Sequence, residues 1–204
     1  MHHRAPHDVA DAGTPTAPHA GQIDVSGAMV ELTISPGMDG TYPPATGTAQ
    51  LYAGGESLNV IAAGGDVPAF EATVTAPGSV DVTSPSLTGG LLMIDRSMDF
   101  PVAWTEGMAV GNVIVRFSGF EMMSDGGSRN VSLGCSFEGS SGMGTVPASA
   151  LGNLPGGGAS GAFSVETSMS TDVMAGGWLV TVNASSIARA EETGGAASAG
   201  TTYP

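Results

Sequence analysis

The sequence contains no lysine and only five arginines, against 19 acidic residues, so its formal net charge is −14. So few basic residues cannot form a basic patch. Binding to the phosphate backbone of nucleic acids and adsorption to anionic lipid are therefore both disfavoured. The acidity chiefly favours solubility and loose association with cations.

Histidine is confined to the first twenty residues, where it occurs as His2, His3, His7 and His19. The rest of the chain has neither histidine nor lysine. This absence excludes Ser-His-Asp and Cys-His catalysis, Schiff-base chemistry and histidine-ligated zinc or copper from that region. Its hydroxyl groups have only carboxylates as base partners, and these are weak bases at pH 7. We therefore expect a protein that is not an enzyme, with no catalytic or cofactor-binding residue.

Cysteine occurs once, as Cys135, so an intrachain disulfide is excluded. Cys135 alternates with Val131, Leu133 and Phe137, which places all four side chains on one face of an expected strand. The pattern predicts a buried, unreactive thiol.

Long apolar runs are also missing, since no stretch approaches the ~20 apolar residues of a membrane span. The start of the chain, MHHRAPHDVADAG, lacks the apolar segment of a signal peptide. We expect no transmembrane segment, and either a cytoplasmic protein or one whose leader has been lost.

What the chain does contain is typical of a folded protein. Its hydrophobic fraction is 41%, with 32 glycines and 13 prolines, and this fraction places it outside the disordered class. Residues 1–20 differ, because they have no hydrophobic period, and we expect a flexible N-terminal tether there. We expect residues 21–204 to form a single domain. Two small β domains, 21–84 and 85–204, are the alternative.

The strongest pattern lies in residues 91–118. Phe100, Val102 and Trp104 share one face of a period-two run, and Val113–Phe117 forms a second such run. Glu106-Gly107 and Gly111 lie between them, which predicts a hairpin.

Similar short runs separated by glycine and proline turns fill the rest of the chain. They predict an all-β fold, an antiparallel β-sandwich of Ig-like or jelly-roll-like type with about ten strands. One helical turn is expected around Ala148 to Leu151. The last run expected as a clear strand is 178–184, and the segment after it is expected to add an edge strand or a short helix before fraying.

Several side chains are candidates for a site. Asp95 and Asp99 flank the central strand and are the pair to test for acid–base glycan cleavage, although a solvated loop explains them better. The remaining candidates are loop acids for calcium (Asp39-Gly40, Asp66, Asp125-Gly126) and the Cu(II)- or Ni(II)-chelating start Met1-His2-His3. Turn residues and ordinary tail residues are the simpler interpretations, so we expect no metal site.

Aromatic residues are scarce, at 5% of the chain. Trp104 and Trp178 both lie in phase with aliphatic neighbours, which favours core positions over sugar-stacking platforms. Tyr42 and Tyr52 remain stacking candidates. We expect the methionines, including Met122-Met123, to fill gaps in an aromatic-poor core.

Four segments carry a family resemblance: GGDVPAF (64–70), IDRS with FPVAWT (94–105), CSFEGSSGMGTVPASAL (135–151) and AGGWLVTV (175–182). In these segments the chain resembles uncharacterised Gly- and Ala-rich cell-envelope proteins of Gram-negative bacteria. Such proteins are often lipoproteins with an Ig-like sandwich behind a low-complexity tether. The resemblance implies an extracytoplasmic location, in the periplasm, at the outer membrane surface or secreted, although the chain has no lipobox cysteine. It supplies no catalytic residues.

Together these observations predict a non-enzymatic module of the cell envelope or surface, with a structural or protein-binding role. Its partner would be an unknown protein or envelope component. The alternative is a glycan-binding or carboxylate-dependent glycan-cleaving domain.

Overall fold

The computed structural model describes residues 17–43, 51–105, 107, 109–124 and 126–204. Over these residues the protein is almost entirely β, with fourteen strands, one four-residue α-helix and one turn of 3-10 helix at Gly139–Ser141. The helix, α1 (Ala148–Leu151), lies where the sequence predicted it. The prediction of an all-β, sandwich-like fold built mainly from antiparallel strands is confirmed.

Three sheets make up the fold. In spatial order, the strands of the first sheet are β2 (Leu32–Ile34), β1 (Ile23–Ser26), β3 (Ser57–Ala62) and β4 (Phe70–Thr75). Those of the second are β10 (Met143–Val146), β7 (Phe100–Trp104), β5 (Asp81–Ser84) and β13 (Arg189–Ala190). Those of the third are β6 (Leu91–Met93), β14 (Ser198–Tyr203), β11 (Ala159–Ala175), β8 (Asn112–Met122) and β9 (Ser128–Glu138), with β12 (Trp178–Ile187) paired to β11.

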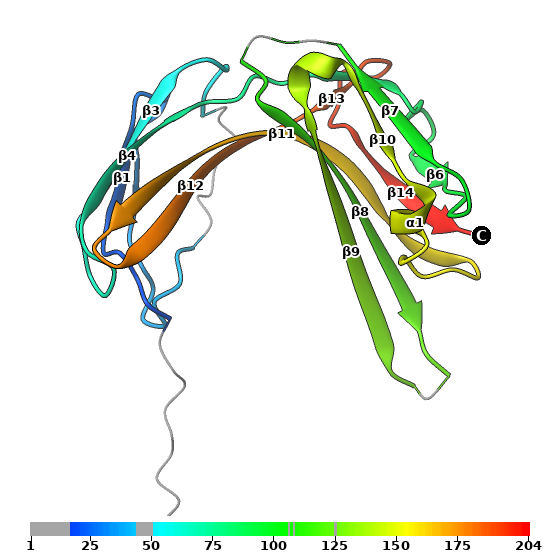
Figure 1. The fold of residues 1–204 in the computed structure, drawn as a ribbon, viewed down its shortest axis with the longest axis horizontal. Helices are drawn as coiled ribbons and strands as arrows, with labels where there is room; N and C mark the ends of the chain where they lie inside the picture. The colour runs from blue at the N-terminus through cyan, green and yellow to red at the C-terminus, as the bar shows by residue number, and fades with distance from the viewer. Residues whose placement is uncertain (1–16, 44–50, 106, 108, 125) are drawn as a thin grey trace, which may run out of the picture.

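The sheets form an arch with β11 across its top (Figure 1). On one side the first sheet covers the hairpin of β11 and β12. On the other side the second sheet covers the part of the third sheet that contains β8, β9, β14 and the first half of β11. Strand β11, 17 residues long, therefore belongs to both sides.

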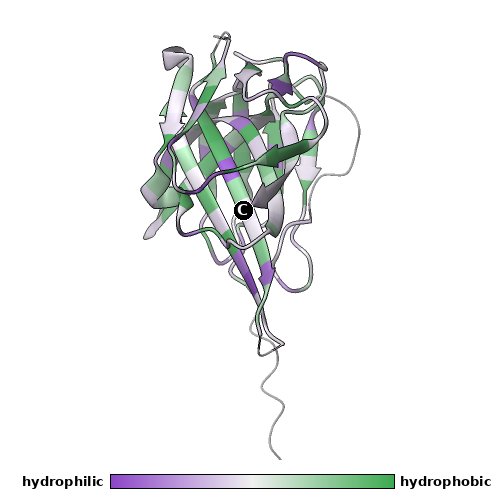
Figure 2. Cartoon of the chain, turned by 90° about the vertical axis from the view of Figure 1, so that its right-hand side faces the viewer, coloured by the Kyte–Doolittle hydropathy of each residue, from purple (hydrophilic) through white to green (hydrophobic). Residues whose placement is uncertain are grey.

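The main core lies between the second and third sheets. Apolar residues alternate along the facing strands, as Figure 2 shows for the right-hand side of the arch. The inward set is fully or almost fully buried, and it includes Val102 and Trp104 of β7, Val113, Val115 and Phe117 of β8, Phe163 and Val165 of β11, and Tyr203 of β14. Period-two patterning thus places every second residue of these strands in one shared interior.

Smaller clusters hold the first sheet against the β11–β12 hairpin. One contains Leu58, Val74, Ala76 and Ala184, with Met169 packed against it. The other contains Ala20, Ala62, Val67 and Ala175. The N-terminal sheet therefore buries its apolar face against strands that are about a hundred residues away in the sequence.

The predicted hairpin of the Trp104 run and the Val113–Phe117 run is wrong. β7 pairs with β5 and β10 in the second sheet, whereas β8 pairs with β9 and β11 in the third. The two runs face each other across the core, where the rings of Phe100 and Phe117 meet edge to face with centroids 5.5 Å apart. Both runs bury one face, and the connection of residues 105–111 is long enough to cross between sheets. Of the expected turn, Glu106 lies outside the described residues.

The sequence predictions for the two tryptophans and for the C-terminal segment had different outcomes. Trp104 is buried, as predicted, and its indole N–H donates to the Gly139 carbonyl at 2.8 Å. Trp178 is 45% exposed, so its expected core position is wrong: it lies at the hairpin turn, at the end of the strand that the first sheet covers. The expected fraying of the C-terminal segment is also wrong, because β14 pairs on both edges and Tyr203 is fully buried.

The methionines do not fill the core. Of the nine that lie in the described residues, only Met169 packs against a core cluster, and the other eight rank among the exposed large hydrophobic side chains: Met29, Met38, Met93, Met98, Met122, Met123, Met143 and Met174. Valine, alanine and a few aromatic rings fill the interior instead.

The expected tether, 1–20, falls mostly on residues 1–16, which lie outside the described residues. The Ala17 N–H donates to the Asp39 carbonyl and the His19 carbonyl accepts from the Val67 N–H, while Ala20 is buried beside Ala62. The packed chain thus begins before Gly21. Within the described residues, no helix is long and apolar enough to cross a membrane.

Replacing Trp104 by alanine should lower the free energy of unfolding by about 3–5 kcal/mol, because it leaves a large cavity in the main core and removes the indole hydrogen bond to the Gly139 carbonyl. Trp178→Ala is the matched control, and its effect should stay within about 0.5 kcal/mol since the ring is half exposed. Urea denaturation followed by circular dichroism measures both. Equal losses for the two variants would contradict the assignment of Trp104 as a core anchor.

Candidate functional site

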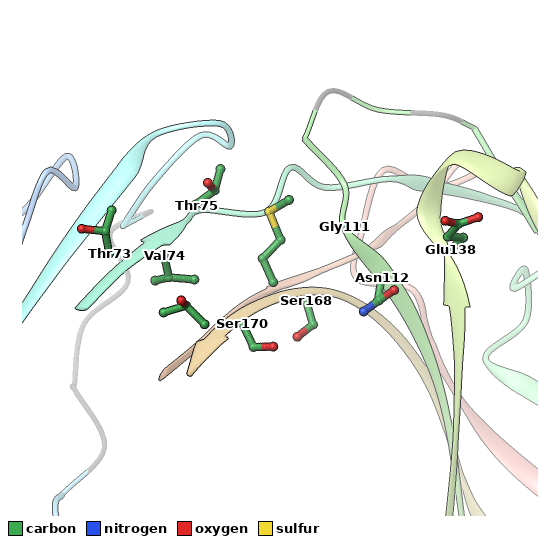
Figure 3. Close-up of a pocket in the computed structure, with 10 residues that line it drawn as sticks. Thr73, Val74, Thr75, Gly111, Asn112, Glu138, Ser168 and Ser170 are labelled. Carbon is green, nitrogen blue, oxygen red and sulfur yellow. The ribbon is translucent and has the colours of Figure 1, made fainter. Parts of the chain in front are cut away.

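A cleft of about 520 Å³ lies at the top of the arch, where its two sides meet. Strand β4 forms one wall with Thr73–Thr75, and the start of β8 with the end of β9 forms the other, through Gly111, Asn112 and Glu138. Ser168–Thr171 of β11 lie between the walls (Figure 3). Residues far apart in the sequence thus meet here because β11 serves both sides of the arch.

Gly111 sets how closely β8 approaches β11. It forms an isolated bridge with Ser168, and its φ of 64° lies in the left-handed region that favours glycine. A Cβ at this position would meet the Ser168 carbonyl oxygen at 2.6 Å. Beyond Ser168 the ladders contain no β8 partner for β11, so the two strands diverge and open the cleft.

The backbone of β11 is unpaired on the cleft side from Ser170 onward, within the part of the chain that the structure describes. Its partner β12 closes through Gly176-Gly177, with Ala175 opposite Trp178. In a two-residue hairpin the flanking residues form a hydrogen-bonded pair, and such pairs then alternate. Odd-numbered residues therefore bond toward β12, and Val165 confirms this parity because its carbonyl accepts the Ala188 N–H. The N–H and C=O groups of Ser170, Asp172 and Met174 point to the other side, where the ladders contain no strand.

Strand β4 presents a second open edge, since it ends the order of the first sheet. The Ala76 N–H donates to the Glu56 carbonyl at 2.8 Å, which fixes the side on which residues bond to β3. By the same alternation, the backbone groups of Thr73 and Thr75 point away from β3. The cleft is thus bordered by two strand edges that are free among the described residues.

The side chains of the cleft offer hydrogen bonds rather than proton transfer. Hydroxyl groups come from Thr73, Thr75, Ser170 and Thr171, an amide from Asn112 and one carboxylate from Glu138, over an apolar floor of Val74 and Met169. Ser168 is buried, and its Oγ accepts from the Asn183 side chain at 2.9 Å. Glycan cleavage requires two carboxylates across the scissile bond, and the lining contains one. A polar, extended ligand fits this lining.

Asp95 and Asp99, the pair named as candidates for glycan cleavage, both have local structural partners. Asp95 accepts hydrogen bonds from the N–H and the hydroxyl of Ser97, and these lower the pKa of its carboxyl. Asp99 accepts the N–H of Ala148 at 2.8 Å, at the first turn of α1. They stabilise a turn and a helix start, and neither lines the cleft.

The candidate calcium loops form local turn contacts where they are described, as the simpler interpretation predicted. Asp39 accepts from the N–H and hydroxyl of Thr41, which lowers the pKa of its carboxyl. The Oδ2 atom of Asp66 lies 3.8 Å from Nε2 of His19. Asp125, like the Met1-His2-His3 start and His7, lies outside the described residues. In the described chain no group of three or more His, Cys, Asp or Glu side chains is placed to hold a metal ion.

The expected stacking residues are not gathered in one place. The Tyr42 hydroxyl donates to the Gly21 carbonyl at 2.7 Å and accepts the Ala20 N–H. The Tyr52 hydroxyl bonds to the Ser185 carbonyl, and its ring lines a separate hollow with Ile187. Trp178 lies at the hairpin turn.

Sequence patterns identified none of the cleft residues as part of a site, and Gly111 was expected only as a turn residue, although one signal was present. From residue 163 to residue 173, odd-numbered positions hold Phe, Val, Met or Thr and even-numbered positions hold Ser, Glu or Asp, just before the Gly176-Gly177 turn. Such alternation predicts one long strand closing as a hairpin with the run after Trp178. Alternation does not specify which strands lie beside this one, so the open edge itself has no signal in the sequence.

Comparison of the chain with known protein families, curated proteins and solved structures finds no match. The resemblance to cell-envelope proteins therefore stays a prediction.

The open edge predicts alternating hydrogen exchange along β11. Amides of Thr171 and Val173 should be protected by the β12 ladder, whereas amides of Ser170 and Asp172 should exchange rapidly. Residue-resolved exchange by NMR measures this. Uniform protection across 170–173 would show that another part of the chain occupies the edge.

Cys135 is partly buried, not fully buried as the sequence predicted. It should still react slowly with a thiol reagent at neutral pH, because partial burial raises the pKa of its thiol and so disfavours the thiolate. The rate should increase when urea unfolds the protein. Equal rates in both conditions would contradict the placement of Cys135 against the main core.

Proposed function

We propose that this chain is a non-enzymatic β-sandwich module that binds a partner protein by strand addition. An extended segment of the partner pairs with the open edge of β11 and lies in the cleft beside β4. The observation that carries the proposal is that the backbone groups of Ser170, Asp172 and Met174 have no strand partner among the described residues and lie next to an open cleft.

Strand addition needs unpaired backbone groups, space for a chain and room for alternate side chains. Hydrogen bonds to the edge supply affinity, and Thr73, Thr75 and Asn112 can bond the polar groups of the added segment. Soluble proteins usually protect open edges with proline, lysine or a bulge. From Ser168 to Ala175 this edge has no proline, and its one charged residue is Asp172.

The place of action we propose is the cell envelope, in the periplasm, on the outer membrane surface or outside the cell. Support for it comes from the resemblance of segments such as 135–151 to envelope proteins. A binding module with a net charge of −14 and no lysine also fits a partner other than nucleic acid or anionic lipid.

Glycan binding is a second candidate, and the half-exposed ring of Trp178 is the observation that favours it. That ring is at the turn of the β11–β12 hairpin, whereas the polar cleft begins at Ser168. The lining of the cleft ends at Thr171, so four residues of strand, about 13 Å, separate it from Ala175, the ladder partner of Trp178. A glycan-array signal lost on Trp178→Ala and retained on Ser170→Pro would favour this candidate.

Ser170→Pro tests strand addition directly. Proline removes the outward N–H and places a ring on the edge, without removing a bond from the β12 ladder. The wild-type protein is first screened against a random library of immobilised peptides, each about nine residues long, and the peptides that capture it are kept. The affinity of the Ser170→Pro variant for these peptides should be lower by at least about tenfold.

Ser170→Ala is the matched control, because it removes the hydroxyl and keeps the N–H. It should bind the same peptides as the wild type. The circular dichroism spectrum and melting temperature of both variants should match the wild type. A folded Ser170→Pro protein with the wild-type affinity for these peptides would contradict the proposal.

A further inference from the structure

We infer that the added segment is basic, with lysine or arginine at two positions four residues apart. This inference rests on the proposed function and specifies the chemistry of the partner. Its basis is the position of two carboxylates on one face of the third sheet: Asp172 on the open edge of β11, and Glu138 at the end of β9, in the lining of the cleft.

The two carboxylates lie on the same face of the third sheet. Glu138 is opposite Asn112 in the β8–β9 ladder, and paired residues in a ladder share a face. Arg116, also even-numbered on β8, is opposite Ser164 of β11. Even-numbered residues of β11 therefore share the face of Glu138, and Asp172 is one of them.

Their spacing follows from the strand. Glu138 and Ser168 line the same end of the cleft, and Gly111 bridges to Ser168. Asp172 lies four residues farther along β11, about 13 Å at the rise of an extended chain. An added strand has the same rise, so when its residue i is opposite Asp172, its residue i+4 reaches the Gly111 end of the cleft, where the segment leaves the edge beside Glu138.

Neither carboxylate has a basic partner among the described residues, because the described arginines are bound elsewhere. Arg116 pairs with Glu166, Arg129 with Glu121 and Arg189 with Asp81, while Arg96 donates to the Leu154 carbonyl. Asp172 accepts one hydrogen bond, from the Thr181 hydroxyl at 2.7 Å. Both carboxylates are exposed and available to a cation that the partner brings.

Charge also disfavours a second copy of this chain as the occupant. Two copies paired through β11 would bring the Asp172 and Glu138 carboxylates of both chains together. Each chain has a formal net charge of −14 and no lysine to offset this repulsion. Like charges across paired strands are destabilising. The occupant we propose is therefore a basic segment of a different protein.

The test uses four soluble peptides about nine residues long, of alternating threonine and valine. The first has lysine at its third and seventh positions, the second has glutamate there, the third is uncharged, and the fourth has lysines at the third and sixth positions, on opposite faces. The full-length protein should bind the first peptide most tightly, by at least about fivefold over the third and the fourth. Fluorescence anisotropy measures each affinity, and that of the first should fall between about 50 and 500 mM NaCl.

Glu138→Gln and Asp172→Asn should each weaken binding of the first peptide about two- to fivefold and leave the uncharged peptide unchanged. Glu191→Gln, an equal loss of charge at an exposed position outside the cleft lining, is the matched control and should change neither.

The outcomes separate this inference from the proposed function. Binding that ignores peptide charge but is lost in Ser170→Pro would overturn the basic specificity and leave strand addition standing. No binding to any of the four peptides, or binding unaffected by Ser170→Pro, would overturn both. A concentration-dependent dimer in sedimentation analysis, absent in Ser170→Pro, would assign the edge to a second copy and overturn the basic partner.

Discussion

Strand β11 is the element on which the rest of the structure depends. Phe163 and Val165 at its start are buried in the main core, whereas Met169 and Ala175 farther along pack against the first sheet. Between them Thr167 is fully buried, and its hydroxyl donates to the Gly78 carbonyl at 2.7 Å. One continuous ladder thus ties two apolar interiors, and the connection between β4 and β5 is bonded to it at the crossing.

The candidate site is a consequence of this arrangement. On one side of β11, β14 pairs along Ala159–Ser164 and β12 takes over from Glu166. On the other side, β8 pairs only along Ser160–Val165, and its last contact is the Gly111 bridge to Ser168. Strand β11 continues beyond the point where β8 pairs with it, and its backbone edge there borders the cleft. The binding proposed for this cleft uses backbone groups and requires no catalytic side chain.

Sequence reasoning predicted what local patterns determine. Alternation identified the runs of β7 and β8, the all-β class and the burial of Trp104, and the flanking prolines located α1. Alternation did not predict which strands pair with each other in a sheet. The Phe100–Trp104 run and the Val113–Phe117 run each need an apolar face opposite, and period two does not say whether two such runs pair side by side or stack. Trp178 has the parity of its buried neighbours, but only the position of the first sheet decides how far the covered region extends. The cleft depends on such non-local choices at every wall, so none of its residues could be recognised from the chain alone.

The central claim is that β11 couples two separate interiors into one cooperative structure. Methyl NMR during a urea titration tests it in the unmodified protein, with Val74 reporting the first sheet and Val115 the main core. Coupling through a shared strand predicts that both methyl signals lose their native intensity at the same urea concentration. Two separate midpoints, with Val74 released while Val115 keeps its native signal, would show that the sides of the arch fold independently and would contradict the account.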